Sequence, residues 1–517
     1  MSPPPQPNGW WRGASLYEVY LRSFQDSDGD GEGDLRGLAH RLDYLAALGI
    51  DGIWITPFFP SPMHDSGYDV SDYRSVDPRF GTLDDFKAVV EGAHGRGLKV
   101  VIDQVYSHSS HTHPWFVESA ASRTGPKSDW YVWADPKPDG SPPNNWLARF
   151  GGIAWEWSPT RRQYYLHNFL AEQPDLNLHN PEVQDEVLDI MGFWFGLGVD
   201  GLRLDVANFF MHDPDLRDNP PAKLDEVPAN PYYLQQRVYD RSRPENLPFL
   251  ERMREIAGDR MLLAEISCDR QVERMAEYTA PGRLHTAYSF ELLTAKLDGA
   301  HIARSVERAG ADKSWPAWAF SNHDVERVAS RWGAEKVQML HALLVSLRGT
   351  VIFYQGEELG LAHSPVPRER LRDPEAIRFW PHHRGRDGAR TPMAWDGRED
   401  LGFTDGNAWL PPEPNHRPLS AAAQTGDPAS HLEHCRRAIA LRKSKPALRL
   451  GSFETVEADA TGLTFWRRYE GQNLLCSFNF TETSREMPLA PNGHTLMGAI
   501  DAGGVPPHSY WIVDATR

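Results

Sequence analysis

The stretch Gly201-Leu-Arg-Leu-Asp205 decides the fold class, because it is a short apolar strand that ends in a carboxylate. Asn180-Pro181, which lies upstream, is a typical helix start. Apolar residues then follow at helical spacing, namely Val183, Val187, Ile190 and Trp194. The sequence therefore predicts a helix that returns the chain to a buried strand.

The same unit of helix and buried strand recurs along the chain. An apolar helix face, made by Leu38, Leu42, Leu45 and Leu48, precedes the strand 52–55. Thr82 and Asp85 form a capping-box pattern ahead of the strand Lys99-Val-Val-Ile-Asp103. Further buried strands are predicted at 261–266, 318–320 and 350–354. Strands that alternate with helices indicate a parallel sheet.

The positions of the polar residues favour a closed barrel over an open sheet. Asp103, Asp205, Glu265 and Asn322-His323-Asp324 all follow different strands. In a closed barrel these strand ends converge on one mouth, whereas an open doubly wound sheet gathers them at its switch point. A dinucleotide fingerprint in the required context is absent from the sequence. We therefore expect an α/β fold of the (β/α)8 TIM-barrel type.

Breaks in this alternation of helices and strands predict the domain organisation. The barrel is expected at 1–103 and 180–445, with an insertion domain at 104–179 after the third strand. Long loops are expected at about 207–248 and 361–421, and such loops are usually functional. Short alternating strands after 446 predict a C-terminal β-sandwich domain at 446–517.

Composition excludes several classes of function. The 517 residues are 40% apolar and 24% charged, which is ordinary for a globular protein. The net charge of −17 argues against a nucleic-acid partner, which needs a basic face. The three cysteines are far apart in sequence, so neither a disulfide framework nor a zinc cluster is expected.

Membrane association and secretion are not expected either. The longest apolar runs fall short of the roughly 20 residues that cross a bilayer. Met1 to Trp11 is proline-rich and polar, without the basic start and apolar stretch of a secretory signal. A cytoplasmic location is therefore expected.

Three acids directed into one barrel mouth repel each other, and holding them there suggests a function. Two carboxyl groups can serve as nucleophile and general acid/base in glycoside cleavage, and a third can stabilise a cationic transition state. Arg203 lies two residues before Asp205 on the same strand face, where it would keep that acid ionised. Each residue alone has a structural interpretation, as a helix cap or a hydrogen-bonded histidine, and only the combination favours catalysis.

Four motifs occur in order, namely Asp103-Gln-Val-Tyr-Ser-His108, Gly201–Asp205, Glu265 after a buried strand, and Ser321-Asn-His-Asp324. With them the chain resembles glycoside hydrolase family 13, the α-amylase family, over nearly its whole length. The resemblance implies that Asp205 is the nucleophile, Glu265 the general acid/base and Asp324 the transition-state stabiliser. It also implies a set of sugar-binding side chains, namely Tyr68, His108, Arg203 and His323.

Two further stretches, 67–73 and 385–393, look like the exo-acting branch of α-glucosidases and oligo-1,6-glucosidases. The resemblance implies a retaining exo-α-glucosidase that acts on short α-glucosides such as maltose, isomaltose or sucrose-like compounds. Asp69 and Arg390 are expected to pair and to hold the terminal 4-hydroxyl. Val206 after the nucleophile goes with α-1,6 bonds in this branch. Ser107 replaces a frequent Asn, which weakens any amylase-like calcium site.

The acidic loop Asp26-Ser-Asp-Gly-Asp-Gly-Glu-Gly-Asp34 predicts a cation site. Acids at alternate positions, with glycines between them, can surround a hard cation with oxygen atoms. It begins like an EF-hand loop, but Gly37 stands where the bidentate Glu would be. The similar loop of this family branch implies a structural divalent cation, calcium rather than magnesium. The implied ligands are Asp26, Asp28, Asp30, Asp34 and the carbonyl of Glu32. A solvated acidic loop is the alternative, and no organic cofactor is expected.

Several related activities would use the same residues. An α-glucosyltransferase or a sucrose or trehalose isomerase differs from a hydrolase only in what intercepts the glucosyl-enzyme. A non-catalytic transporter heavy chain would lack the acids and carry a membrane helix, and a carbohydrate-binding module needs no buried acids. Linkage preference, the balance of hydrolysis and transfer, and oligomeric state stay open at this point.

Overall fold

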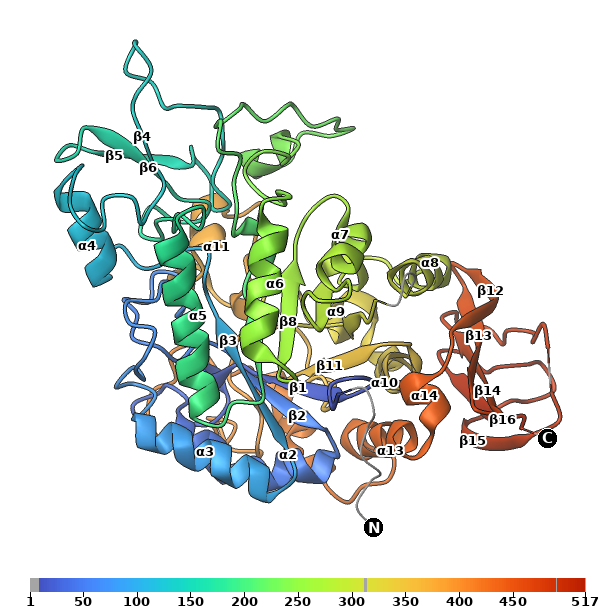
Figure 1. The fold of residues 1–517 in the computed structure, drawn as a ribbon. Helices are drawn as coiled ribbons and strands as arrows, with labels where there is room; N and C mark the ends of the chain where they lie inside the picture. The colour runs from blue at the N-terminus through green and yellow to red at the C-terminus, as the bar shows by residue number, and fades with distance from the viewer. Residues whose placement is uncertain (1–8, 311–313, 490, 517) are drawn as a thin grey trace.

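The computed structural model describes residues 9–310, 314–489 and 491–516, so the stretch Met1 to Asn8 lies outside the described residues. Eight parallel strands form its central sheet (Figure 1). They are β1 (Ser15–Val19), β2 (Gly52–Ile55), β3 (Lys99–Gln104), β7 (Gly201–Leu204), β8 (Met261–Ile266), β9 (Thr286–Ser289), β10 (Ala317–Ala319) and β11 (Thr350–Tyr354).

The sheet closes into a barrel. Strand β1 pairs with both β2 and β11, and the remaining neighbours follow in the order β2-β3-β7-β8-β9 on one side and β11-β10 on the other. A parallel bridge between Ala287 in β9 and Pro316, directly before β10, joins the two ends. The predicted (β/α)8 barrel is thus confirmed. One of its strands, β9, was not predicted from the sequence pattern.

Helices surround the barrel (Figure 1). They are α1 (Leu35–His40), α2 (Leu42–Leu48), α3 (Leu83–Gly95), α5 (Pro181–Gly196), α6 (Asn246–Ala257), α7 (Gln271–Tyr278), α8 (Gly299–Ala309), α9 (Val328–Trp332), α10 (Val337–Ser346), α12 (Ala421–Gln424), α13 (His431–Ser444) and α14 (Pro446–Leu450). The two helix N-termini predicted from the sequence are observed. Thr82 and Asp85 form a capping box on α3, and the Asn180 side chain caps α5.

Residues between β3 and α5 form a small subdomain above the barrel mouth (Figure 1). It contains α4 (Pro114–Ala121) and a three-stranded sheet of β4 (Trp133–Ala134), β6 (Gln163–Leu166) and β5 (Trp155–Ser158). Trp146 and Trp155 lie in an apolar cluster of its own. The insertion therefore has a separate core while it shares the mouth of the barrel.

The C-terminal residues form one antiparallel sheet, beside α8, α10 and α14 (Figure 1). Its order is β12 (Glu454–Asp459), β13 (Gly462–Tyr469), β14 (Gln472–Asn479), β16 (Tyr510–Asp514) and β15 (His494–Gly498). Phe465 and Phe478 join the main core. The predicted β domain is confirmed, but in the described residues barrel helices, rather than a second sheet, cover its inner face.

Two buried arginines, Arg442 in α13 and Arg467 in β13, bind the turn before β11. Arg442 donates hydrogen bonds to the carbonyl oxygens of Val345 and Leu347, at 2.6 and 3.1 Å, and also to that of Gly349. Arg467 donates to the carbonyl oxygen of Ser346. Burial lowers the pKa of Arg467 to about 9. Main-chain oxygens thus replace water around both guanidinium groups.

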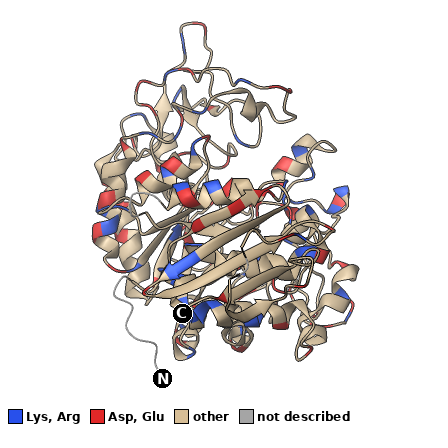
Figure 2. Cartoon of the chain, turned by 90° about the vertical axis from the view of Figure 1, so that its right-hand side faces the viewer, with Lys and Arg blue, Asp and Glu red and all other residues tan. Residues whose placement is uncertain are grey.

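In the view of Figure 2, charged residues of both signs are spread along the chain. Within the described ranges, every helix is too short or too polar to cross a bilayer. The expected cytoplasmic location stays a prediction.

Candidate active site

Asp205 lies at the carboxyl end of β7, where the chain turns sharply. Gly201 begins this strand against β8, and a side chain there would meet the Met261 carbonyl oxygen at 2.8 Å. Val206 has a φ of 36°, in the left-handed region, and its N–H donates to Glu265 Oε2 at 3.1 Å. The turn therefore brings the nucleophile candidate next to the acid at the end of β8.

Arg203 connects the acids of three strands. It is completely buried, and its Nη1 donates to Asp103 at 2.8 Å and to Asp205 at 2.7 Å. Its Nη2 lies 2.6 Å from Glu265 Oε2 and donates to the Tyr288 hydroxyl at 3.0 Å. One guanidinium group thus fixes two candidate catalytic carboxylates at the same wall, as the sequence predicted for Asp205.

One cation faces three carboxyl groups here, so the charges are unbalanced. Burial raises the pKa of Asp205 and of Glu265, although Arg203 acts to lower both. The neighbouring acids raise them further: Glu265 and Asp103 act on Asp205, while Asp324 and Asp103 act on Glu265. Because Arg203 stabilises one negative charge better than two, the pair favours a state that retains a proton. A nucleophile and a proton donor need such a state.

Asp324 follows β10 and is surrounded by cations. Arg390 Nη2 donates to it at 2.7 Å and Arg386 Nη1 at 3.3 Å. Burial acts to raise the pKa of Asp324, but His323, Arg386 and Arg390 together lower it well below its usual range. Asp324 is therefore ionised at neutral pH, which suits a group that stabilises developing positive charge.

His323 and Tyr68 stack on each other with ring centroids 5.5 Å apart. The Tyr68 hydroxyl donates to Asp103 at 3.0 Å and lies 2.8 Å from His323 Nε2, while Nδ1 contacts Glu18 at the end of β1. Burial lowers the pKa of His323 to about 3 and raises that of Glu18. The ring is therefore neutral at pH 7 and fixed at both nitrogens.

His108 is the other predicted histidine, and it borders the same pocket. Its Nε2 lies 3.1 Å from the Tyr68 carbonyl oxygen, and its Nδ1 lies 2.9 Å from the Ser107 hydroxyl. Burial lowers its pKa to about 4, so it is also neutral at pH 7. Both of its ring nitrogens are thus engaged with protein groups, and the ring borders the pocket without adding charge.

The expectation that Asp69 pairs with Arg390 is wrong, because the structure does not bring these residues together. Asp69 is fully buried and accepts hydrogen bonds from the Ser61 hydroxyl at 2.8 Å and the His64 N–H at 2.9 Å. Arg390 binds Asp324 instead. At the pocket the acid–arginine pair consists of Asp65 and Arg386, whose Nη2 donates to Asp65 at 2.8 Å.

These groups surround a cavity of about 320 Å³ at the barrel mouth. Aromatic and cationic side chains from the inserted segments complete its wall. They are Arg149, Phe150, Phe169, Phe209, Tyr232, Tyr233, Arg241 and Phe290. The sequence pattern did not single out these residues, nor did it single out Asp65, Arg386 and Glu18. The aromatic content of the long loops was the available signal.

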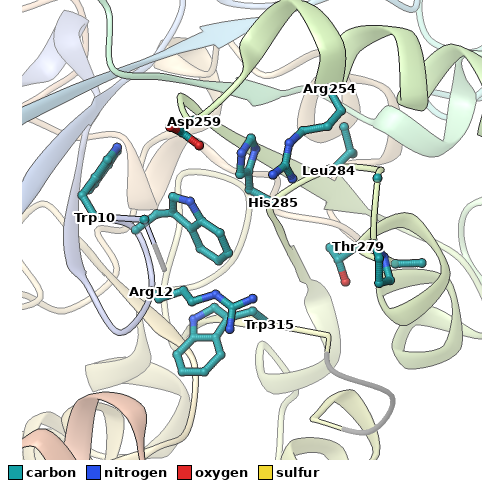
Figure 3. A pocket seen from close by; sticks show the side chains of 13 residues that line it. Trp10, Arg12, Arg254, Asp259, Thr279, Leu284, His285 and Trp315 are labelled. Carbon is teal, nitrogen blue, oxygen red and sulfur yellow. The ribbon is translucent and has the colours of Figure 1, made fainter. Parts of the chain in front are cut away.

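A larger cavity, about 650 Å³, lies at the opposite end of the barrel (Figure 3). Trp11, Asp259, His285 and Trp315 line it, and each precedes or begins a barrel strand. Among the described residues that border it, Asp259 supplies the carboxylate and no second acid accompanies it. Among its described lining residues, this cavity therefore lacks the pair of acids that the cavity at the mouth contains.

Three acids of the predicted cation loop gather after β1. Oxygen atoms of Asp26, Asp28 and Asp34 lie within 4.8 Å of one another, a separation compatible with a shared cation. Glu32 turns its carboxylate to Arg22 at 2.6 Å, which leaves its carbonyl as the available group. The cluster described here does not include Asp30.

The family model of the α-amylase catalytic domain matches residues 18–451. The chain belongs to the α-amylase family. A probable alpha-glucosidase of Rhizobium meliloti (strain 1021) is 50% identical over 503 residues, which cover 93% of this chain and 91% of the relative. An oligo-1,6-glucosidase of Heyndrickxia coagulans is 37% identical over 523 residues, which cover 92% and 93%.

Structural comparison leads to the same branch of the α-amylase family. The crystal structure of the alpha-glucosyl transfer enzyme XgtA superposes with a TM-score of 0.95 and 49% sequence identity, covering 98% of this chain and 99% of that chain. The predicted resemblance to family 13 is thus confirmed. This chain is a glycoside hydrolase of the α-glucosidase type.

Proposed function

We propose that the protein is an exo-acting, retaining α-glucosidase that releases or transfers glucose from the non-reducing end of short α-glucosides. The contact of Arg203 with both Asp205 and Glu265 carries this proposal. Both carboxyl groups bind the same guanidinium group and therefore share one wall of the pocket. This arrangement supports a mechanism in which one of them attacks the sugar directly.

In the proposed reaction, the ionised Asp205 attacks the anomeric carbon while Glu265 gives its proton to the departing glycosidic oxygen. The bond to the leaving group breaks as the bond to Asp205 forms. Water or an acceptor hydroxyl then gives a proton to Glu265 and displaces Asp205 from the anomeric carbon. Asp324, kept ionised by Arg386 and Arg390, stabilises the positive charge of each transition state.

Exo action is supported by the walls of the pocket. Segments from 104–179, 207–248 and 361–421 all contribute side chains around the acids, among them Phe150, Tyr232 and Arg386. The Asp65–Arg386 pair offers oxygen and N–H groups to the hydroxyls of a terminal glucose. Maltose, isomaltose and sucrose-like compounds are the proposed substrates.

Transfer in place of hydrolysis is the second candidate. The structural likeness to an alpha-glucosyl transfer enzyme favours it, and the same residues serve both outcomes. We also propose that the acidic loop holds a structural divalent cation, calcium rather than magnesium, through Asp26, Asp28 and Asp34.

The stereochemistry of the first product tests the mechanism. NMR spectroscopy during early turnover of an α-glucoside should show α-glucose, whereas β-glucose as the first product would contradict retention. Asp205→Asn should lose nearly all turnover. Glu265→Gln should still form the glucosyl-enzyme from an activated aryl glucoside, and mass spectrometry should detect the added glucosyl group on the Asp205 peptide.

A further inference from the structure

Three inserted segments meet behind the entrance of the catalytic pocket. Arg149 comes from the subdomain above the barrel, and Asn230 comes from the loop after β7. Glu375 belongs to the short helix α11 (Pro374–Phe379), in the loop after β11. Since Arg149 borders the pocket and Glu375 does not, the acid lies behind the arginine.

The contacts at this junction fix both side chains. Arg149 Nη1 donates to Glu375 Oε1 in an ion pair. Asn230 Nδ2 donates to the same Oε1 at 3.0 Å and to the Arg149 carbonyl oxygen at 2.9 Å. The side chain of Glu375 is 1% exposed, whereas that of Arg149 is 27% exposed. A buried negative charge therefore balances a positive charge that faces the pocket.

Aromatic rings frame the exposed side of this guanidinium group. Its carbon lies 5.8 Å from the ring centroid of Tyr232 and 5.6 Å from that of Tyr233, and both rings border the pocket. The acids that perform the proposed reaction lie elsewhere in the pocket wall, at the strand ends. Arg149 and the two tyrosines come from the inserted loops, not from the strand ends that carry these acids.

Helix α11 holds a second pocket arginine in a similar way. Asp373, which caps this helix, accepts from Arg386 Nη2 at 2.8 Å. Arg386 additionally contacts Asp65 and Asp324, so it also binds one of the proposed catalytic acids. Among the described contacts, Glu375 is the carboxylate that binds Arg149. The charge that Arg149 itself presents to the pocket therefore depends on this one acid.

We propose that Arg149, Tyr232 and Tyr233 bind the leaving or acceptor group, and that Glu375 restricts this site to uncharged, hydroxyl-bearing groups. The inference rests on the proposed glucosidase function. A guanidinium group balanced by a buried carboxylate still donates hydrogen bonds to hydroxyls. Its net attraction for a phosphate dianion is small, because the phosphate would also face the repulsion of Glu375. Glu375 is a positioning residue, since it acts through Arg149.

The choice between a neutral and a phosphorylated acceptor tests the site. With p-nitrophenyl α-glucoside as donor, we expect the wild-type enzyme to transfer glucose to free glucose about tenfold or more efficiently than to glucose 6-phosphate. Equal or preferred use of the phosphate would overturn the proposal, and this measurement needs no variant.

Glu375→Gln keeps the shape of the acid and removes its charge, so the guanidinium charge becomes available to the acceptor. The ratio of transfer to glucose 6-phosphate over transfer to glucose should rise about tenfold, and this ratio does not depend on the overall rate of p-nitrophenol release. Glu399→Gln makes the same change at an exposed position of the same loop and should leave the ratio unchanged. Adding Arg149→Met to Glu375→Gln should abolish the gain.

An unchanged ratio in a folded Glu375→Gln protein, judged by its melting temperature, would contradict the inference. Failure of the proposed function would be recognised separately, because wild-type protein would then release no p-nitrophenol. Calorimetric titration of Asp205→Asn and Asp205→Asn/Glu375→Gln with glucose 6-phosphate measures the charge preference without turnover. Binding that the Glu375 change does not strengthen would also overturn it.

Discussion

Arg386 donates a 2.8 Å hydrogen bond to Asp65, which lies 321 positions earlier in the chain. The same guanidinium group contacts Asp324 and is held from behind by Asp373. The loop after the eighth strand is thereby joined to the loop after the second, beside Asp324 at the barrel mouth. The contact between Arg386 and Asp65 therefore closes one side of the pocket.

Replacing Arg386 by Lys should weaken transition-state binding, because an ammonium group keeps the charge but loses the planar fork. Loss of a charge-assisted hydrogen bond costs about 1.5–3 kcal/mol, or roughly 10- to 150-fold in kcat/KM. Steady-state kinetics with maltose and an aryl glucoside measure the change. Arg398→Lys, at an exposed arginine of the same loop, is the control and should have little effect.

Acid should destabilise the fold through buried histidines. Burial lowers the pKa of His341 to about 4 and that of His434 to about 2, against about 6.5 in an unfolded chain. The unfolded state therefore binds more protons below pH 6.5, and stability falls as pH decreases towards these folded-state values. Each group contributes at most about 1.4 kcal/mol per pH unit.

Melting temperatures measured from pH 7 to 4.5 should show this loss. His434→Gln should flatten the decline, because it removes one group that binds a proton only on unfolding. A decline of the same steepness in this variant would show that other groups control acid stability.

Removal of a divalent cation should act on stability more than on catalysis. An ion present at 100 times its dissociation constant stabilises the native state by about 2.7 kcal/mol. Chelator should therefore lower the melting temperature while activity at low temperature changes little. Asp28→Asn should reduce this chelator effect, whereas Asp84→Asn, on an exposed helix start, should not. If elemental analysis finds no ion and chelator changes nothing, the loop is a solvated acidic turn.

Val206→Thr should shift turnover from isomaltose towards maltose. Val206 borders the pocket directly after Asp205, the proposed nucleophile, and the Val206 N–H donates to Glu265. A change of its side chain therefore alters the space beside the scissile bond while the main chain stays held. The ratio of kcat/KM for the two disaccharides measures the shift, and an unchanged ratio would assign linkage preference to the loops.

The sequence allowed the strand ends to be found, because Asp103, Asp205 and Glu265 each terminate a short apolar run. Glu18 escaped notice, since β1 is brief and carries its acid one residue before its end. Strand β9 was missed for a similar reason: Thr286-Ala-Tyr-Ser289 is not a conspicuous apolar run. Local pattern reveals such elements only when their composition is distinctive.

The error over Asp69 and Arg390 has a physical cause. The stretch 385–393 contains both Arg386 and Arg390, whereas Asp65 lies four residues before Asp69, just outside the stretch 67–73. Positive φ angles at Ser66 and Gly67 reverse the chain between the two acids, so Asp65 faces the pocket while Asp69 binds nearby N–H and hydroxyl groups. Spacing alone does not reveal such a turn, and the partners come from distant segments.

The guanidinium groups of Arg442 and Arg467 bind main-chain oxygens of the turn that leads into β11. Both arginines come late in the chain, so ribosomal synthesis delivers them after every barrel strand has emerged. A nascent chain that ends before Arg442 lacks both donors, so the turn that leads into β11 is then without their hydrogen bonds. Cutting the gene at the expected domain boundary, before residue 446, would keep Arg442 in α13 but remove Arg467 in β13. The barrel would then lose one of the two guanidinium groups that hold this turn.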